Sequence, residues 1–279
     1  FPTRRSSDLS NPQKISHNIL EVMADYLAVG IDPQHTTICL QSALPALAEL
    51  TALYMNIVTV ARVERNPTVK NEIAQKGFSR SLPVGFLAYP ISQAADITAF
   101  KAELVPVGDD QLPMIEQTNE IVHKMNSLTT TPILQHCKAL LSDVSRLPGI
   151  DGNAKMSKSL GNTLTLSASE EEIHRAVSAM YTDPNHLRVA DPGQVEGNVV
   201  FTYLDAFHAD KAFVAEMKAH YRRGGLGDRQ CKNALETCLQ ELLAPIRERR
   251  ATYIQDKGML LALLRHESHR RLPRSRPKA

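Results

Sequence analysis

Two lysines in a glycine-flanked segment are the residues best suited to chemistry in this chain. Lys155 and Lys158 belong to the run Lys-Met-Ser-Lys-Ser, inside a stretch that begins and ends with glycine at positions 149 and 161. Two ammonium groups on a mobile loop can bind a polyphosphate and stabilise the charge that develops on it during reaction. A bare Lys-x-x-Lys pair usually marks an exposed basic loop, but the intact pentapeptide favours a phosphate clamp.

A second group combines a hydroxyl, an amide and a carboxylate within an apolar segment. Tyr89, Gln93 and Asp96 occupy positions i, i+4 and i+7 between Gly85 and Thr98. In a helix all three side chains project from one face. A buried aspartate there requires a partner, and a ligand N–H is a suitable one. A solvent-facing polar stripe is the alternative interpretation.

A third group lies at the end of a short strand-like run at positions 104–107. The segment from Val105 to Gln111 reads Val-Pro-Val-Gly-Asp-Asp-Gln, which predicts a strand, a glycine turn at Gly108 and the first turn of a helix. This geometry would let backbone at Gly108 approach a ligand and would place Gln111 beside it. Gly-x-x-Gln on its own is a weak signal.

The elements that must position these groups follow from local patterns. Asn11 and Pro12 are typical of a helix start, and an apolar stripe continues to Leu27, before Gly30. Further along the chain we expect strands at 36–40 and 104–107 and helices at 44–60, 83–99 and 110–125. Alternating helices and strands predict a parallel sheet covered by helices, with ligands at the carboxyl ends of the strands.

The chain changes character after the lysine loop. Ser169 and Glu172 form a capping pattern, and amphipathic helix follows, with a break at Gly224-Gly-Leu-Gly227 and an interruption or kink at Pro245. We therefore expect a partial catalytic domain at 10–166 and a helical domain at 167–264. Residues 1–9 are expected to be an artefactual leader, and 265–279 a disordered basic tail.

Composition supports a globular, cytoplasmic protein. The chain has 279 residues, 43% of them hydrophobic, and no apolar run long enough for a membrane span or a signal peptide. Its four cysteines are expected to be ordinary reduced residues. The net charge of +2 says little about nucleic acid, although basic residues cluster toward the end of the chain, where Arg247 and Arg250 lie. A solvated helix face is the ordinary interpretation of that cluster.

Together, in this order and spacing, the three groups resemble those of the tryptophanyl-tRNA synthetases, a class I family. The likeness extends from about Tyr26 to about Arg250 and includes Tyr-Leu-Ala-Val-Gly-Ile-Asp-Pro, Gln-Ser-Ala-Leu-Pro-Ala and Leu-Pro-Gly-Ile-Asp-Gly-Asn-Ala. It implies a Rossmann-like parallel sheet with helices on both faces, an all-helical C-terminal domain that binds tRNA(Trp), and a homodimer. The alternatives are a tyrosyl-tRNA synthetase-like enzyme, which shares the Tyr-x-x-x-Gln-x-x-Asp helix, and a non-catalytic synthetase-derived tryptophan- or RNA-binding protein.

The resemblance also implies roles for individual residues. A catalytic role in adenylate formation falls to Lys155, Ser157 and Lys158. The ATP site comprises Lys70, Gly108, Asp110, Lys155, Met156, Ser157, Lys158 and Ser159. It receives ATP together with Mg²⁺, and the resemblance implies neither metal-binding side chains nor a tightly bound cofactor. The tryptophan site comprises Tyr89 and Gln111 at the α-ammonium group, Asp96 at the indole N–H, and Gln93 on the same face. Contacts to the tRNA backbone are expected from Arg247 and Arg250.

Two features depart from the family pattern. Class I synthetases begin with a strand and a glycine-containing turn into a helix with a His-x-Gly-His-like signature, and no such element precedes Tyr26. Beyond Leu264 helical patterning is lost. We therefore expect the first strand–helix segment to be missing, and the polypeptide as given to bind tryptophan poorly and to activate it too slowly to be useful. Normal exchange activity would overturn that expectation.

Overall fold

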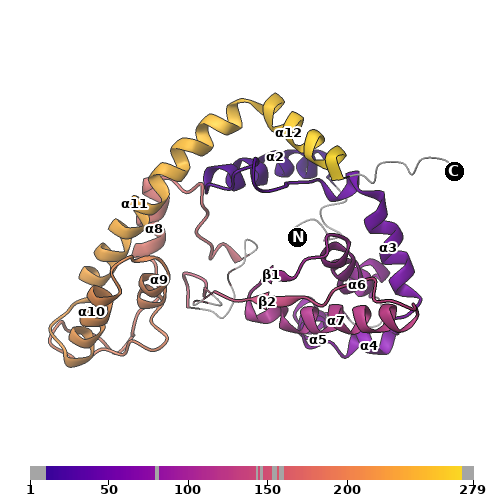
Figure 1. The fold of residues 1–279 in the computed structure, drawn as a ribbon. Coiled ribbons are helices and arrows are strands. Elements are labelled where there is room, and N and C mark those ends of the chain that lie inside the picture. Colours follow the sequence, from indigo (N-terminus) through magenta and orange to yellow (C-terminus); the bar gives the residue numbers. More distant parts are fainter. Residues whose placement is uncertain are drawn as a thin grey trace. The chain divides into compact units, whose positions relative to one another are not determined.

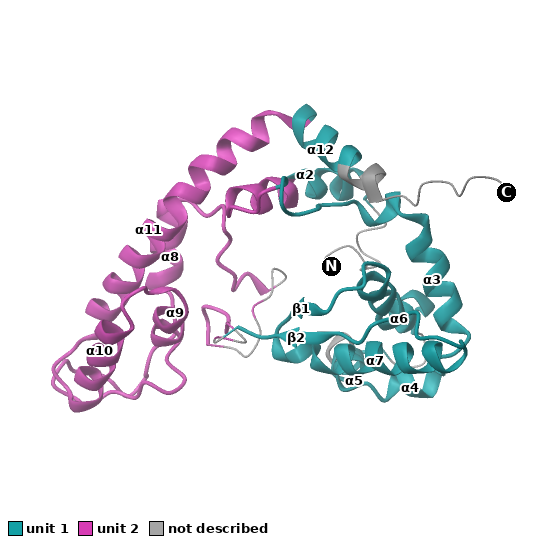
Figure 2. Ribbon diagram, in the orientation of Figure 1, with its two compact units in different colours: residues 1–20, 33–142, 258–279 teal, residues 21–32, 143–257 magenta. Residues whose placement is uncertain are grey.

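The computed structural model describes residues 11–78, 82–142, 144, 147–152, 156 and 160–271. The chain divides into two compact units (Figure 2). The first comprises residues 1–20, 33–142 and 258–279, and the second comprises residues 21–32 and 143–257. Helix α2 (Pro12–Ala28) supplies residues to both, and it begins as predicted, with the Asn11 side chain accepting a hydrogen bond from the Lys14 backbone N–H at 3.0 Å. Gly30 follows it with a φ of 104°.

Helices make up most of the first unit (Figure 1). Its elements are the short 3-10 helices η1 (Gln41–Ala43) and η2 (Asp109–Gln111) and the helices α3 (Pro45–Met55), α4 (Val60–Glu64), α5 (Pro67–Lys76), α6 (Val84–Ala99), α7 (Leu112–Ser127) and α12 (Lys257–Arg271). Local signals start several of them. Thr59 and Asn66 cap α4 and α5 with their side chains, and prolines occupy the first turns of α3, α5 and α7.

A two-stranded parallel sheet places the third sequence group. Strand β1 (Leu104–Pro106) pairs with β2 (Lys138–Leu140), Val105 opposite Ala139. These two central residues pack against a cluster that includes Ile97 of α6 and Ile115 of α7, whereas the alternate positions are exposed. The parallel pairing confirms the predicted class of sheet. It places the glycine turn and η2 at the carboxyl end of β1.

The core of the first unit lies between α3, α6 and α7. Tyr54 is fully buried there and shares a 2.7 Å hydrogen bond with Thr98 of α6. Ala94 and Ala95 are buried on the same side of α6 and allow α3 to approach closely. The predicted helix at 83–99 is therefore confirmed, with its apolar side packed and its polar residues on the remaining face.

Two expectations for this unit were wrong. Residues 36–40 do not form the expected strand; they lie in the connection between α2 and η1, and the sheet of the described residues consists of β1 and β2. The helix expected over 44–60 is divided into α3 and α4, since Thr59 adopts an extended conformation and caps a new helix. A short apolar run cannot by itself distinguish a strand from a connecting segment.

The second unit is helical. Its helices are α8 (Glu170–Ser178), α9 (Val199–Phe207), α10 (Lys211–Arg223) and α11 (Asp228–Gln255). Ile173, Phe201 and Leu235 are among the residues that form its core. The capping box of Ser169 and Glu172 is confirmed, as is the break at 224–227.

Two helices run farther than the sequence indicated. Helix α11 continues through Pro245, so the expected interruption is absent. Helix α12 reaches Arg271, past the expected helix end at Leu264. The four cysteines are free thiols. No helix in the described part of the chain is long and apolar enough to cross a membrane.

Candidate functional site

The polar face of α6 is the centre of the candidate site. Tyr89, Gln93 and Asp96 lie on this helix as predicted, and each is partly buried. Asp96 accepts two hydrogen bonds from the Nε2 group of Gln41, at 2.8 Å and 2.9 Å. Gln41 comes from η1 and was not assigned a role from the sequence, although it begins the Gln-Ser-Ala-Leu-Pro-Ala run.

Gln93 connects α6 to the turn after β1. Its side-chain amide donates to Gln111 Oε1 at 3.3 Å, and Gln111 in turn donates to Asp110 at 3.4 Å. The Thr68 hydroxyl of α5 donates to the Asp110 backbone oxygen at 2.6 Å and fixes this turn. The structure therefore brings together Gln93, Asp110 and Gln111. Gly108 directly precedes η2 in extended conformation.

Tyr89 lies in an acidic and apolar environment. Its ring packs edge-on against Phe86, with ring centroids 5.6 Å apart. Burial raises the pKa of Tyr89, and the carboxylates of Glu72 and Asp110 raise the pKa further. The hydroxyl is therefore neutral at physiological pH and can donate or accept a hydrogen bond. Glu72 is a second residue to which the sequence patterns assigned no role.

Lys70, which the family resemblance assigned to the ATP site, lies on helix α5. This helix begins here because Asn66 caps it and Pro67 fits its first turn. Lys70 is exposed on that helix. Its proposed contact with ATP remains a prediction.

The base of the lysine loop is well defined in the second unit. The Ile150 backbone N–H donates to the Asn162 backbone oxygen at 3.1 Å, and the buried Asn162 side chain donates to Asp151 at 3.0 Å. A Cβ atom at Gly149 would lie 2.1 Å from the Asn162 side chain, so glycine is required there. Met156 packs against the core of this unit. Lys155, Ser157, Lys158 and Ser159 lie outside the described residues.

Tyr203 supports the base of this loop and makes the stability of the unit sensitive to high pH. Its hydroxyl donates to the Pro148 backbone oxygen at 2.9 Å, and burial raises its pKa from 10.0 to about 12. Between these values the unfolded chain loses a proton that the folded chain keeps, so the free energy of unfolding falls as pH rises, by about 1.4 kcal/mol per pH unit at most. Below pH 10 this contribution is fully present.

The free energy of unfolding falls with pH partly because of Tyr203, and we expect Tyr203→Phe to remove this contribution between pH 10 and 12. Urea unfolding at a series of pH values would measure it, with Tyr181→Phe, at an exposed tyrosine, as the control. An unchanged slope in Tyr203→Phe would contradict the assignment.

Arg247 and Arg250, predicted to contact tRNA, are both engaged within the second unit. Arg247 donates to the Ala168 backbone oxygen at 3.1 Å. Arg250 pairs with Asp25 at 2.5 Å and with Glu21, and its side chain is only 16% exposed. These contacts tie α11 to the start of α8 and to α2. A contact with tRNA backbone stays a prediction and would compete with these partners.

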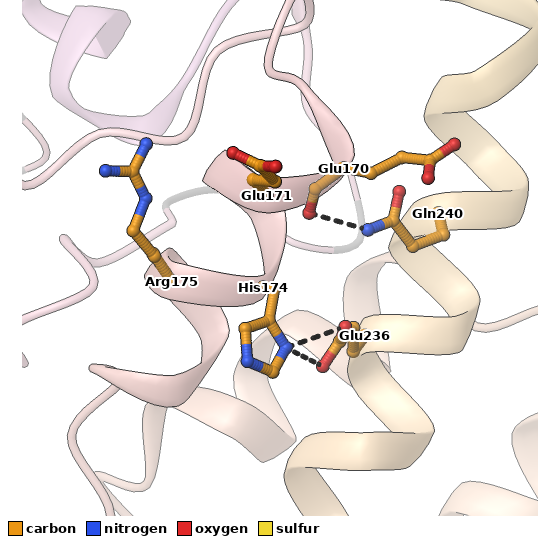
Figure 3. A pocket seen from close by; sticks show the side chains of 6 residues that line it. All are labelled: Glu170, Glu171, His174, Arg175, Glu236 and Gln240. Atoms are coloured by element: carbon orange, nitrogen blue, oxygen red, sulfur yellow. Dashed lines mark hydrogen bonds and ion pairs between the residues drawn. The ribbon is translucent and has the colours of Figure 1, made fainter.

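A surface pocket lies between α8 and α11, and Glu170 of its lining pairs with the predicted tRNA-contact residue Arg247 at 3.4 Å. Figure 3 shows His174 directed at Glu236, with Nδ1 2.9 Å from a carboxylate oxygen, and Gln240 donating to the Glu170 backbone oxygen at 2.9 Å. These contacts join the two helices. Among the described residues, no cluster of three or more His, Cys, Asp or Glu side chains could hold a metal ion.

Polar groups at the carboxyl end of a parallel strand flanked by helices are typical of nucleotide-binding α/β proteins. The family model of class I tRNA synthetases for tryptophan and tyrosine, "tRNA synthetases class I (W and Y)", matches residues 3–244. A tryptophan–tRNA ligase of Clostridium longisporum is 55% identical over 262 residues, which cover 93% of this chain and 77% of that protein. One of Streptococcus pyogenes serotype M1 is 54% identical over 261 residues, with 92% and 77% covered.

Solved structures of tryptophanyl- and tyrosyl-tRNA synthetases are also similar to this chain. The tryptophanyl-tRNA synthetase of Campylobacter jejuni, complexed with ADP and tryptophan, matches with a TM-score of 0.75 and 28% identity, covering 96% of this chain and 81% of that one. A tyrosyl-tRNA synthetase of Archaeoglobus fulgidus, 20% identical with a TM-score of 0.57 and coverage of 81% and 70%, shares the fold. The chain belongs to the class I tRNA synthetase family of the tryptophan and tyrosine enzymes.

Proposed function

We propose that this chain activates L-tryptophan with ATP and transfers it to tRNA(Trp). The observation that carries the proposal is the 55% identity to a tryptophan–tRNA ligase over 93% of the chain. The polar face of α6, with Asp96 directed at Gln41 and Gln93 at Gln111, supports it from the structure. We further propose that the chain acts as a homodimer, as the family resemblance implies.

The reaction proceeds in two displacements. A carboxylate oxygen of tryptophan attacks the α-phosphorus of ATP, the bond to the bridging oxygen breaks, and pyrophosphate leaves with the electron pair. A hydroxyl of the terminal adenosine of tRNA then attacks the acyl carbon, and AMP leaves. Neither step requires a nucleophile from the protein, so catalysis depends on positioning and on stabilising phosphate charge. Mg²⁺ enters with ATP as part of the substrate.

Each group of residues has a defined task in this scheme. Asp96 accepts the indole N–H, while Tyr89 and Gln111 bind the α-ammonium group near the carboxylates of Glu72 and Asp110. The neutral hydroxyl of Tyr89 suits this task, because it can accept from an ammonium group. Lys155 and Lys158 bind the β- and γ-phosphates and stabilise pyrophosphate as it departs, with Ser157 and Ser159 beside them.

Amino-acid selectivity tests the proposal directly. We expect tryptophan to support ATP–pyrophosphate exchange with a kcat/KM on the order of 10⁴ times that of tyrosine, since a site built around a buried polar partner discriminates strongly. The ratio is informative even when the absolute rate is low. A preference for tyrosine would indicate the tyrosyl branch, and tryptophan binding without any exchange would indicate a non-catalytic protein.

A further inference from the structure

Asp96 is held by a residue from a distant part of the chain. We propose that Gln41 is a positioning residue for amino-acid specificity, which keeps the Asp96 carboxylate correctly aimed at a ligand N–H. The inference rests on the proposed function, because it concerns the same tryptophan site. It assigns to Gln41 a task that is separate from the packing of the helices around it.

Both carboxylate oxygens of Asp96 take part in the contact with Gln41. The Gln41 Nε2 atom lies 2.8 Å from Oδ1 and 2.9 Å from Oδ2 of Asp96. An amide NH₂ group can only donate, so both carboxylate oxygens accept, and neither carries a proton directed at Gln41. If Gln41 presented its oxygen instead, three acceptors would face one another.

The proposed role requires Asp96 to accept from a ligand as well as from Gln41. A carboxylate has about four lone-pair positions, and one NH₂ group occupies two of them at most. In the complex with tryptophan, a further position accepts the indole N–H. Because the bond to Gln41 restrains both oxygens, rotation of the carboxylate is restricted, and less ordering is required when the ligand binds.

Packing of α3 on α6 sets the position of Gln41. The residue lies in η1, just before α3, and α3 packs along α6 around the buried Tyr54. A second hydrogen bond joins the same helices, between Tyr54 and Thr98 at 2.7 Å. Tyr54 does not contact Asp96 through any hydrogen bond of the described residues. The chain therefore offers a matched control, because Tyr54→Phe removes one polar link between α3 and α6 and leaves the other intact.

The absence of tryptophan from the protein makes the measurement simple. The chain contains no Trp, so fluorescence excited beyond the tyrosine band comes from the L-tryptophan ligand alone, and the change in its emission when protein is added reports binding. An analogue in which sulfur replaces the indole N–H can be measured by competition with L-tryptophan. We expect Gln41→Leu to weaken tryptophan binding roughly 10- to 100-fold and to change binding of the sulfur analogue less than about twofold.

Two further variants, Gln41→Glu and Tyr54→Phe, complete the test. Gln41→Glu keeps the side-chain shape but places a second carboxyl against Asp96, so it should lose tryptophan affinity at least as strongly as Gln41→Leu. Tyr54→Phe should lower the unfolding midpoint without changing the ratio of the two affinities. Equal losses for tryptophan and the sulfur analogue in the Gln41 variants, or no loss, would overturn the inference. If the unaltered chain binds neither ligand, the proposed function itself fails.

Discussion

Lys158→Ala is expected to slow tryptophan-dependent pyrophosphate exchange roughly 100- to 1,000-fold, the usual effect of removing one preorganised charge-stabilising donor. Tryptophan affinity should change less than about twofold, because the ammonium group acts on phosphates and not on the amino acid. Negative charge on the departing pyrophosphate grows during the reaction. Removal of the ammonium group therefore raises the free energy of the transition state more than that of the bound substrates. Exchange kinetics and the fluorescence titration measure the two quantities separately.

Lys14→Ala provides the control for Lys158→Ala. Lys14 is an exposed lysine of α2, and its replacement removes the same charge from a helix that tolerates alanine well. The base of the loop, where Ile150 pairs with Asn162, should be undisturbed in both variants, so equal unfolding midpoints are expected. Unchanged exchange in Lys158→Ala would remove that lysine from the catalytic assignment.

Asp96→Ala is expected to weaken tryptophan binding roughly 100-fold, because the indole N–H loses a charged acceptor. The same change removes the carboxylate that accepts hydrogen bonds from the Gln41 amide. Asp96→Asn should be nearly as damaging. An asparagine that presents its oxygen to Gln41 must present its NH₂ group to the indole N–H, and two donors then face each other.

Glu103→Gln is the control for Asp96→Asn. It removes one negative charge from an exposed position just before β1, outside the candidate site. Tryptophan affinity should be unchanged in Glu103→Gln. If Asp96→Asn also kept normal tryptophan affinity, Asp96 would not be the acceptor for the indole N–H.

Local patterns predicted much of the fold. The helix of residues 83–99, the strand after position 103 and the capping box at Ser169 all depend on signals within one or two turns of chain, and all were confirmed. The segment at 36–40 was misinterpreted, because whether an apolar run becomes a strand depends on a partner elsewhere in the chain. For a similar reason Pro245 does not interrupt α11, since packing of α11 against α8 and α9 overrides the preference of one residue.

The sequence by itself determined the family, the polar spacing on α6 and the lysine loop, because each is written in neighbouring residues. Only the tertiary structure decided which side chains meet these groups. Gln41 and Asp96 are 55 positions apart, and nothing in either local pattern links them. Their contact exists because α3 packs on α6 through buried apolar residues, and this packing brings an amide at the end of one segment to a carboxylate on another.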